Sequence, residues 1–109
     1  MEVRLVPEAA AELRALPAGE RAAILSALKK LEAGGAALRA PHTSQVKGST
    51  LRELRPRRGR SPWRALYRRL GDTMVVAAVV PEAESDRQGF NRGVRQAEQR
   101  LSKIEEDPT

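Results

Sequence analysis

One segment near the middle of the chain, residues 52–69, combines a high density of arginine with regularly placed apolar side chains. It holds eight arginines and a single acid, Glu53, so its net charge of +7 exceeds the +6 of the whole 109-residue chain. Charge this concentrated repels itself and opposes folding unless an anionic partner lies against it. The apolar residues recur among the charges as they do in half-buried strands, which predicts strands over residues 51–55 and 63–70 and a turn over residues 56–62.

The arginines of this segment are therefore expected on a sheet rather than on a disordered arm. Planar guanidinium groups in fixed positions bind two phosphate oxygens at once, which the single ammonium group of lysine does not. This arrangement favours RNA as the partner.

Length and composition exclude several classes of protein. The chain has room for one domain and one core, so residues 1–109 are predicted to form a single domain in which residues 105–109 are a frayed tail. No cysteine and only one histidine are present, which excludes a disulfide framework and argues against a metal-dependent hydrolase; neither a metal nor another cofactor is expected. Because the sequence has no signal peptide and no apolar run of membrane-spanning length, we expect a cytoplasmic protein without a membrane partner.

Periodicity and turn residues predict the remaining elements. Pro7 ends a first short strand, Gly34 and Gly35 end a helix, and residues 36–49 are polar and predicted to be a loop. In chain order, the predicted elements are a strand over residues 3–6, helices over 8–16 and 19–33, strands over 51–55, 63–70 and 74–80, and a final helix.

The final helix is predicted from a capping signature and an apolar stripe. Ser85 and Gln88 have the spacing of a capping box. Gly89 and Gly93 lower helix propensity, so they mark either a close approach of the backbone to another element or loose first turns. The stripe consists of Phe90, Val94, Ala97, Leu101 and Ile104.

This order of elements resembles the RelE/HigB-type toxins of bacterial toxin–antitoxin systems, in particular their phage Gp49-like branch. The resemblance covers nearly the whole chain and is carried by Lys47-Gly-Ser-Thr-Leu-Arg-Glu-Leu-Arg, by Trp63-Arg-Ala-Leu-Tyr, by the apolar strand and by a last helix rich in alanine and arginine. It implies an α+β fold, a small twisted antiparallel sheet in the order β-α-α-β-β-β-α, with two helices packed on one side.

The resemblance also implies an activity. Members of the family cut messenger RNA, commonly in the ribosomal A site, and an antitoxin silences them. The chain is thus expected to be a toxin that inhibits translation as a metal-independent endoribonuclease, with messenger RNA, the ribosome and a cognate antitoxin protein as partners. In this chemistry a ribose 2′-hydroxyl attacks the neighbouring phosphate.

Candidate site residues follow from the same resemblance. Arg64 occupies the most telling arginine position of the family, and Arg55 and Arg57 match positions of active-site basic residues. Arginine suits this role because negative charge develops on the phosphate oxygens in the transition state. For Arg64, a salt bridge to Glu53 or a solvated position on the strand is the other interpretation. Candidates for RNA binding are Arg58, Arg60, Arg68, Arg69, Lys47 and Trp63, of which Trp63 either stacks on a base or lies at the edge of the core.

The sequence departs from the family pattern between the last strand and the last helix. Relatives carry lysine or arginine there, with a tyrosine or histidine nearby, whereas this chain has Pro81-Glu-Ala-Glu-Ser-Asp-Arg-Gln-Gly-Phe. Arg87 is the catalytic candidate that restores one positive charge. Phe90 is assigned to the core. Glu82 and Glu84 are assigned to the solvated entry of the helix, and either would be a candidate general base if it were desolvated. The general acid and base are thus left unassigned.

Two other functions stay open on this sequence. One is a non-catalytic RNA- or ribosome-binding module with the same fold, and the other is a phage-derived protein whose main role is to bind a protein partner. The acidic segment over residues 81–86 favours these two, whereas Arg55, Arg57 and Arg64 favour the endoribonuclease.

Overall fold

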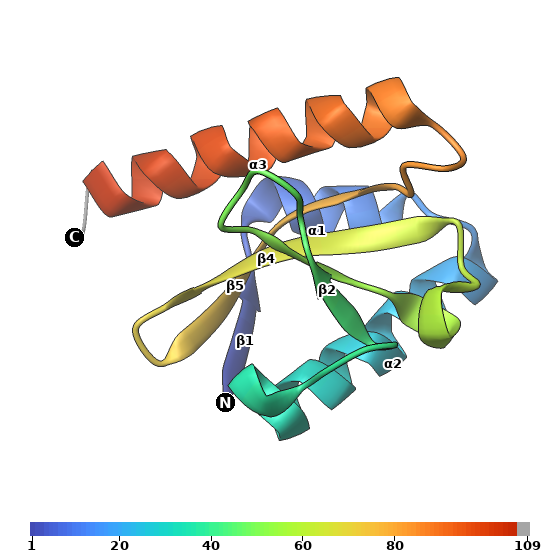
Figure 1. Ribbon diagram of the computed structural model, residues 1–109, viewed down its shortest axis with the longest axis horizontal. Coiled ribbons are helices and arrows are strands. Elements are labelled where there is room, and N and C mark those ends of the chain that lie inside the picture. The colour runs from blue at the N-terminus through green and yellow to red at the C-terminus, as the bar shows by residue number, and fades with distance from the viewer. Residues whose placement is uncertain (107–109) are drawn as a thin grey trace.

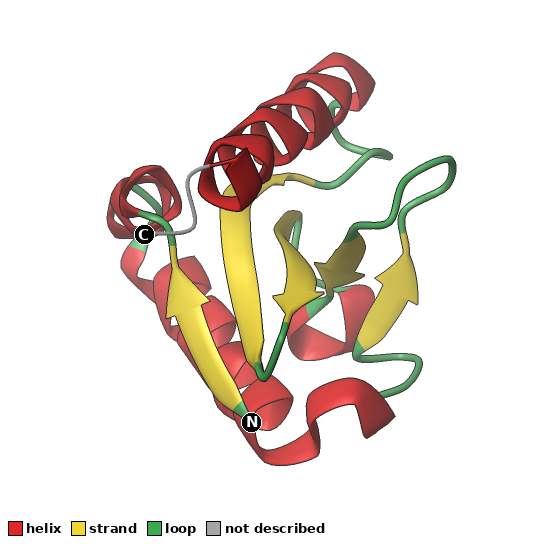
Figure 2. Ribbon diagram, turned by 90° about the vertical axis from the view of Figure 1, so that its left-hand side faces the viewer, coloured by secondary structure: helices red, strands yellow, loops and turns green. Residues whose placement is uncertain are grey.

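The apolar run before Pro81 forms an interior strand of a five-stranded sheet, next to the central strand. The computed structural model describes residues 1–106 and places helices on both faces of this sheet (Figures 1 and 2). The strands are β1 (Glu2–Leu5), β2 (Thr43–Gln45), β3 (Arg52–Leu54), β4 (Trp63–Leu70) and β5 (Thr73–Pro81), and the helices are α1 (Pro7–Arg14), α2 (Ala18–Gly34) and α3 (Arg87–Glu106), with short 3-10 turns η1 (Gly35–Ala37) and η2 (Pro56–Gly59).

The strands lie in the order β1-β5-β4-β3-β2, and the predicted α+β class is confirmed. β4 and β5 pair antiparallel through the turn at Gly71, which has a φ of +61°. The sheet is mixed rather than wholly antiparallel, because β1 pairs in parallel with β5. The predicted loop over residues 36–49 contains β2, whose Thr43 pairs with Leu54 at the sheet edge.

A bulge in β5 changes which side chains face each layer. Leu66 of β4 pairs with Ala78, whereas Tyr67 pairs with Val76, so Ala77 is the extra residue. Ala77 and Ala78 both pack in the cluster under α3. Such an insertion bends the strand and increases its local twist.

An ion pair between α1 and α3 covers the edge of β5 beyond its partner β1. Glu12 accepts a hydrogen bond from the backbone N–H of Val79 at 3.0 Å, and Arg100 donates to the carbonyl of Ala77 at 2.8 Å. The two side chains form an ion pair at 3.0 Å. Open strand edges leave backbone groups unpaired, and here the ion pair satisfies two of them.

The two faces of the sheet carry separate apolar clusters. α1 and α2 cover one face, as the resemblance implies for two helices, and α3 covers the opposite face (Figure 1). Phe90 is buried under α3, which confirms its assignment to the core. Tyr67 is buried on the α2 face, where its hydroxyl lies 2.7 Å from that of Thr43. Within residues 1–106, no helix has the length and apolar character needed to cross a membrane.

The start of α3 differs from the predicted capping box. Asp86, not Ser85, accepts the hydrogen bond from the backbone N–H of Gly89, at 2.9 Å, while the Ser85 hydroxyl donates to Glu82. The helix starts at Arg87, so Asp86 occupies the position directly before it. Of the predicted tail, residues 105 and 106 continue the helix, and residues 107–109 lie outside the described part of the chain.

Gly93 allows α3 to approach β5 closely. Of the two explanations for the glycines of this helix, close approach or loose first turns, the first is therefore the right one. A Cβ atom at Gly93 would overlap the side chain of Val80, and one at Gly89 would lie 2.9 Å from Pro81. Both glycines are buried. The backbone of the first turns of α3 therefore rests directly on the end of β5.

Gly93→Ala should destabilise the protein although alanine is the better helix former. The added methyl forces α3 away from Val80, and overpacking of this kind costs about 1–3 kcal/mol. Asn91→Ala, at an exposed position of the same helix, is the control and should leave stability unchanged or slightly raised. Denaturant unfolding of the two variants measures the difference, and an equal gain in both would show that α3 does not rest on β5.

Candidate RNA-binding site

Arg64 lies inside the protein, on the face of β4 that α3 covers. Its side chain is 5% exposed, and it forms ion pairs with Glu53 of β3 at 3.3 Å and with Glu82 after β5 at 2.8 Å. The guanidinium also donates to three backbone carbonyls, those of Ser61 at 2.6 Å, Trp63 at 2.9 Å and Gly59 at 3.3 Å. One side chain thus connects β4 to β3, to the segment between β3 and β4, and to the segment after β5.

Glu82 is not the solvated helix-entry acid that the sequence predicts. It is half-buried against Arg64 and also accepts a hydrogen bond from Ser85 at 2.7 Å, whereas Glu84 is exposed as predicted. The acid that departs from the family pattern therefore compensates a buried charge. This pairing has a signal in the sequence. Glu82 directly follows β5, and because Arg64 of β4 lies opposite Val80 of β5, the acid is close to the arginine.

Arg64→Ala should strongly destabilise the fold. Removing the guanidinium leaves Glu53 and Glu82 without their shared countercharge in a poorly solvated place, and breaking a buried pair in this way costs about 3–5 kcal/mol. Arg69→Ala, on the exposed end of the same strand, should change stability by less than about 0.5 kcal/mol. Chemical denaturation compares them. Glu82→Gln keeps the volume and removes one charge, so it tests the same cluster if Arg64→Ala does not fold.

Arg55 is the predicted catalytic arginine that reaches solvent beside this cluster. Its side chain is 35% exposed and its Nη1 lies 3.8 Å from Oε1 of Glu53, the same oxygen that Arg64 contacts. Nη1 donates weakly to Ser44 at 3.5 Å, and among the described residues the buried Nε has no hydrogen-bond partner. A Cβ at Gly59 would lie 2.7 Å from Nη2 of Arg55, so the guanidinium packs against bare backbone.

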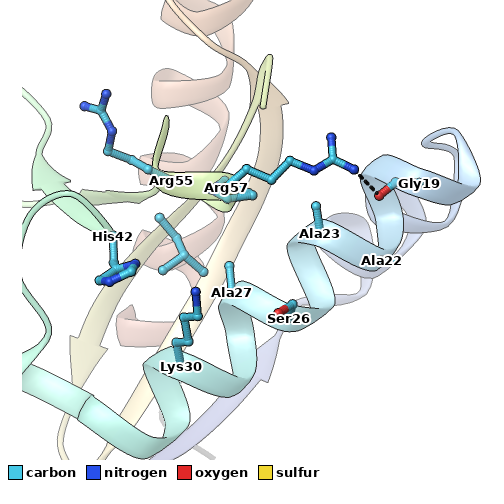
Figure 3. Close-up of a pocket in the computed structure, with 11 residues that line it drawn as sticks. Gly19, Ala22, Ala23, Ser26, Ala27, Lys30, His42, Arg55 and Arg57 are labelled. Carbon is cyan, nitrogen blue, oxygen red and sulfur yellow. Dashed lines mark hydrogen bonds between the residues drawn. The ribbon is translucent and has the colours of Figure 1, made fainter. Parts of the chain in front are cut away.

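Arg57 is separated from this cluster and belongs to the α2 side. It forms an ion pair with Glu20 at 2.8 Å and donates to the carbonyl of Gly19 at 3.2 Å (Figure 3). Glu20 also accepts a hydrogen bond from Ser61 at 2.7 Å, and so it holds both ends of the turn between β3 and β4. A catalytic site shared by Arg55, Arg57 and Arg64 would require the three side chains to lie together. The structure does not bring Arg57 to the other two.

The turn between β3 and β4 has an unusual backbone. Arg57 and Arg58 have φ values of +54° and +58°, and Gly59 follows at +88°. Left-handed conformations of non-glycine residues cost about 1–2 kcal/mol each and persist where surrounding contacts determine them. Arg58 and Arg60, both exposed, are presented on this turn.

Acidification should weaken the attachment of this turn. Hydrogen bonds from Ser61 and Arg57, and the charge of Arg57, hold the pKa of Glu20 below its ordinary value of 4.5, while burial partly opposes them. Since the folded-state pKa is the lower one, the stabilisation is present above about pH 4.5 and is lost as the pH falls through the folded-state value. The difference in the free energy of unfolding between wild type and Glu20→Gln should therefore become smaller as the pH falls below about 4.5. Ser61→Ala should move the loss to higher pH, and a pH-independent difference would contradict this.

The other RNA-binding candidates are spread over both ends of the sheet. Arg68 forms an ion pair with Glu105 of α3 at 2.9 Å, and Arg69 pairs loosely with Asp72, 3.8 Å away. Trp63 is half-buried and packs against the α2-side cluster, which places it at the edge of the core. Both arginines lie near the β4–β5 turn, away from Arg55.

Lys47 and Arg87 meet at a hollow of about 350 Å³ beside α3. Arg95 lines the same hollow and was missed as a candidate. Its signal in the sequence is the spacing of eight residues from Arg87, which places both side chains on one face of a helix. Within residues 1–106, no three acidic, histidine or cysteine side chains are grouped in a way that could hold a metal ion.

Comparisons with known proteins place the chain in a family. The model of the phage-derived Gp49-like proteins matches residues 11–80, and no curated protein matches the chain. Among solved structures, the toxin–antitoxin complex RelBE2 from Mycobacterium tuberculosis is similar, with 22% identity, a TM-score of 0.57, and coverage of 74% of this chain and 96% of that one. The chromosomal ParDE system from P. aeruginosa is similar at 22% identity and a TM-score of 0.55, over 72% and 92% of the chains. The fold is thus shared with these systems, and the chain belongs to the phage-derived Gp49-like family.

Proposed function

We propose that this protein is the toxin of a toxin–antitoxin pair and that it cleaves messenger RNA at the ribosome without a metal ion. Its family and its fold support the first part, because the similar structures are a toxin–antitoxin complex and a toxin–antitoxin system. A cognate antitoxin protein is accordingly the proposed partner. The charge distribution of the β3–β4 region supports the second part.

The observation that carries RNA cleavage is the carboxylate of Glu53 between two guanidinium groups, one buried and one open to solvent. A phosphate bound by Arg55 would lie beside this carboxylate. Glu53 would then accept the proton of the ribose 2′-hydroxyl as its oxygen attacks phosphorus, while Arg55 stabilises the charge on the phosphate oxygens. The bond to the 5′-oxygen of the next nucleotide breaks, and this oxygen takes a proton from solvent water. The products are a cyclic 2′,3′-phosphate and a 5′-hydroxyl, and Glu53 returns its proton to solvent.

In this proposal Arg64 is a positioning residue, whereas the sequence favoured direct contact with the phosphate. Both of its carboxylate partners would have to release it before it reached RNA. In place, it fixes Glu53 and the carbonyls of the turn that carries Arg58 and Arg60. Those two arginines, with Lys47 and Arg87, then bind the RNA backbone, where each contact adds affinity and salt dependence.

A second candidate function is RNA or ribosome binding without cleavage. Two observations favour it: the charge of Arg64 is neutralised inside the protein, and the buried Phe90 supplies no proton donor. The two functions predict the same binding and different products, so a cleavage assay separates them.

The cleavage test uses ribosome-bound messenger RNA, with EDTA present, and the purified full chain. Arg55→Ala should lower the cleavage rate about 100- to 1,000-fold, the scale of losing one preorganised donor to a developing charge. Arg58→Ala, an exposed arginine on the adjacent turn, is the matched control and should mainly weaken binding and its salt dependence. A 2′-deoxyribose at the cut position should abolish cleavage in all variants.

Three results would contradict the proposal. Equal, modest losses from Arg55→Ala and Arg58→Ala would make the arginines a binding surface only. Persistent cleavage at the 2′-deoxyribose would exclude the 2′-hydroxyl as nucleophile. Binding without any cut product would favour the second candidate function.

A further inference from the structure

A groove of about 340 Å³ separates α2 from the end of β3 and the turn that follows (Figure 3). Its walls are apolar and mostly formed by small residues, so backbone and methyl groups leave room for an inserted side chain. The α2 wall consists of Gly19, Ala22, Ala23, Ser26 and Ala27, and the facing wall contains Leu54 and Pro56.

The rim of this α2 groove carries basic side chains and no acid. Lys30 and His42 lie near one end and Arg57 near the other (Figure 3). Among the described residues, neither the ammonium of Lys30 nor the imidazole of His42 has a hydrogen-bond or ion-pair partner. Arg55 contributes to the lining, but its guanidinium points away from the groove. Two nitrogen donors are thus available at one end of an apolar channel.

An exposed leucine extends the apolar surface of α2 beyond the groove. Leu25 is 46% exposed, and it is the most exposed large hydrophobic residue among those described. It lies one helical turn from Ala22, on the adjoining strip of the helix. Apolar surface rimmed by charge is typical of a protein-binding site.

We propose that the α2 groove binds an acidic segment of a partner protein, with an aliphatic side chain on the alanines and carboxylates at Lys30 and His42. RNA fits this groove less well, because no tryptophan, tyrosine or phenylalanine lines it and the imidazole of His42 is the single ring in its lining that could stack on a base. A free inorganic anion fits less well too, since only Lys30 and His42 share one end of the groove, while Arg57 lies at the other end and is already paired with Glu20.

Arg55 borders both this groove and the proposed cleavage site, but its guanidinium points away from the groove. The groove opens on the α2 face, where Leu54 packs, whereas Leu66, on the same side of β4 as Arg64, packs under α3. The inference requires no RNA chemistry, so it can fail or hold independently of the proposed function.

Fluorescence anisotropy of the full chain with a labelled peptide tests the proposal. The probe is a peptide of about ten residues in which glutamate and leucine alternate, a length that spans a groove of this kind in extended form. Lys30→Glu should weaken its binding about tenfold or more, since it replaces attraction by repulsion at the rim. Lys29→Glu, at the neighbouring exposed position outside the groove, is the matched control and should weaken binding less than about twofold.

Two further changes separate charge from shape. Ser26→Trp places a large ring into the mouth of the groove from an exposed position, and it should abolish binding without touching the rim charges. Peptides with glutamine for glutamate, or serine for leucine, should both bind poorly. Cleavage of RNA by the Lys30→Glu variant should equal that of wild type.

The proposal is overturned if the peptide does not bind saturably, or if Lys29→Glu and Lys30→Glu weaken it equally, which would indicate general charge attraction. It is also overturned if a single-stranded RNA oligomer, and not the peptide, loses affinity in Lys30→Glu and Ser26→Trp. In that case the groove is an RNA subsite.

Discussion

A guanidinium taken out of water must find its compensation in the protein, and the region around Arg64 is arranged to supply it. Removal from water costs several kcal/mol per ion unless partners of opposite charge and hydrogen-bond acceptors replace the solvent. Here the partners come from β3, from the β3–β4 connection and from the segment that leaves β5. The positions of three chain segments at one end of the sheet therefore depend on a single side chain.

Most arginines of the central segment consequently fall into two groups. Arg64, Arg57 and Arg68 are paired with acids on other elements, and they connect the sheet to its surroundings. Arg58 and Arg60 are exposed on the turn, while Arg55 lies half-exposed between the two groups. The high local charge is thus partly neutralised within the protein, and the remainder is concentrated near the turn.

The regular elements followed from the sequence where periodicity was strong. Strand β4 has the predicted limits, because alternation over eight residues is a clear signal. Strand β2 was missed, since three polar residues at a sheet edge show no period. Alternation places residues on faces of a sheet but does not say what covers each face. The burial of Arg64 and its pairing with Glu82 therefore depended on the tertiary structure. The parallel pairing of β1 has no local signal for the same reason.

The contact between Gly93 and Val80 has a consequence for the geometry of the surface. Because Gly93 has no side chain, the backbone of α3 lies directly on Val80 of β5. The distance between helix and sheet is therefore set by this one contact and not by two side chains that could both adjust. Arg87 and Arg95 of α3 line a hollow together with Lys47 of the loop after β2. The backbone that carries these two arginines is therefore held at a fixed height over the sheet, whichever rotamers their side chains adopt.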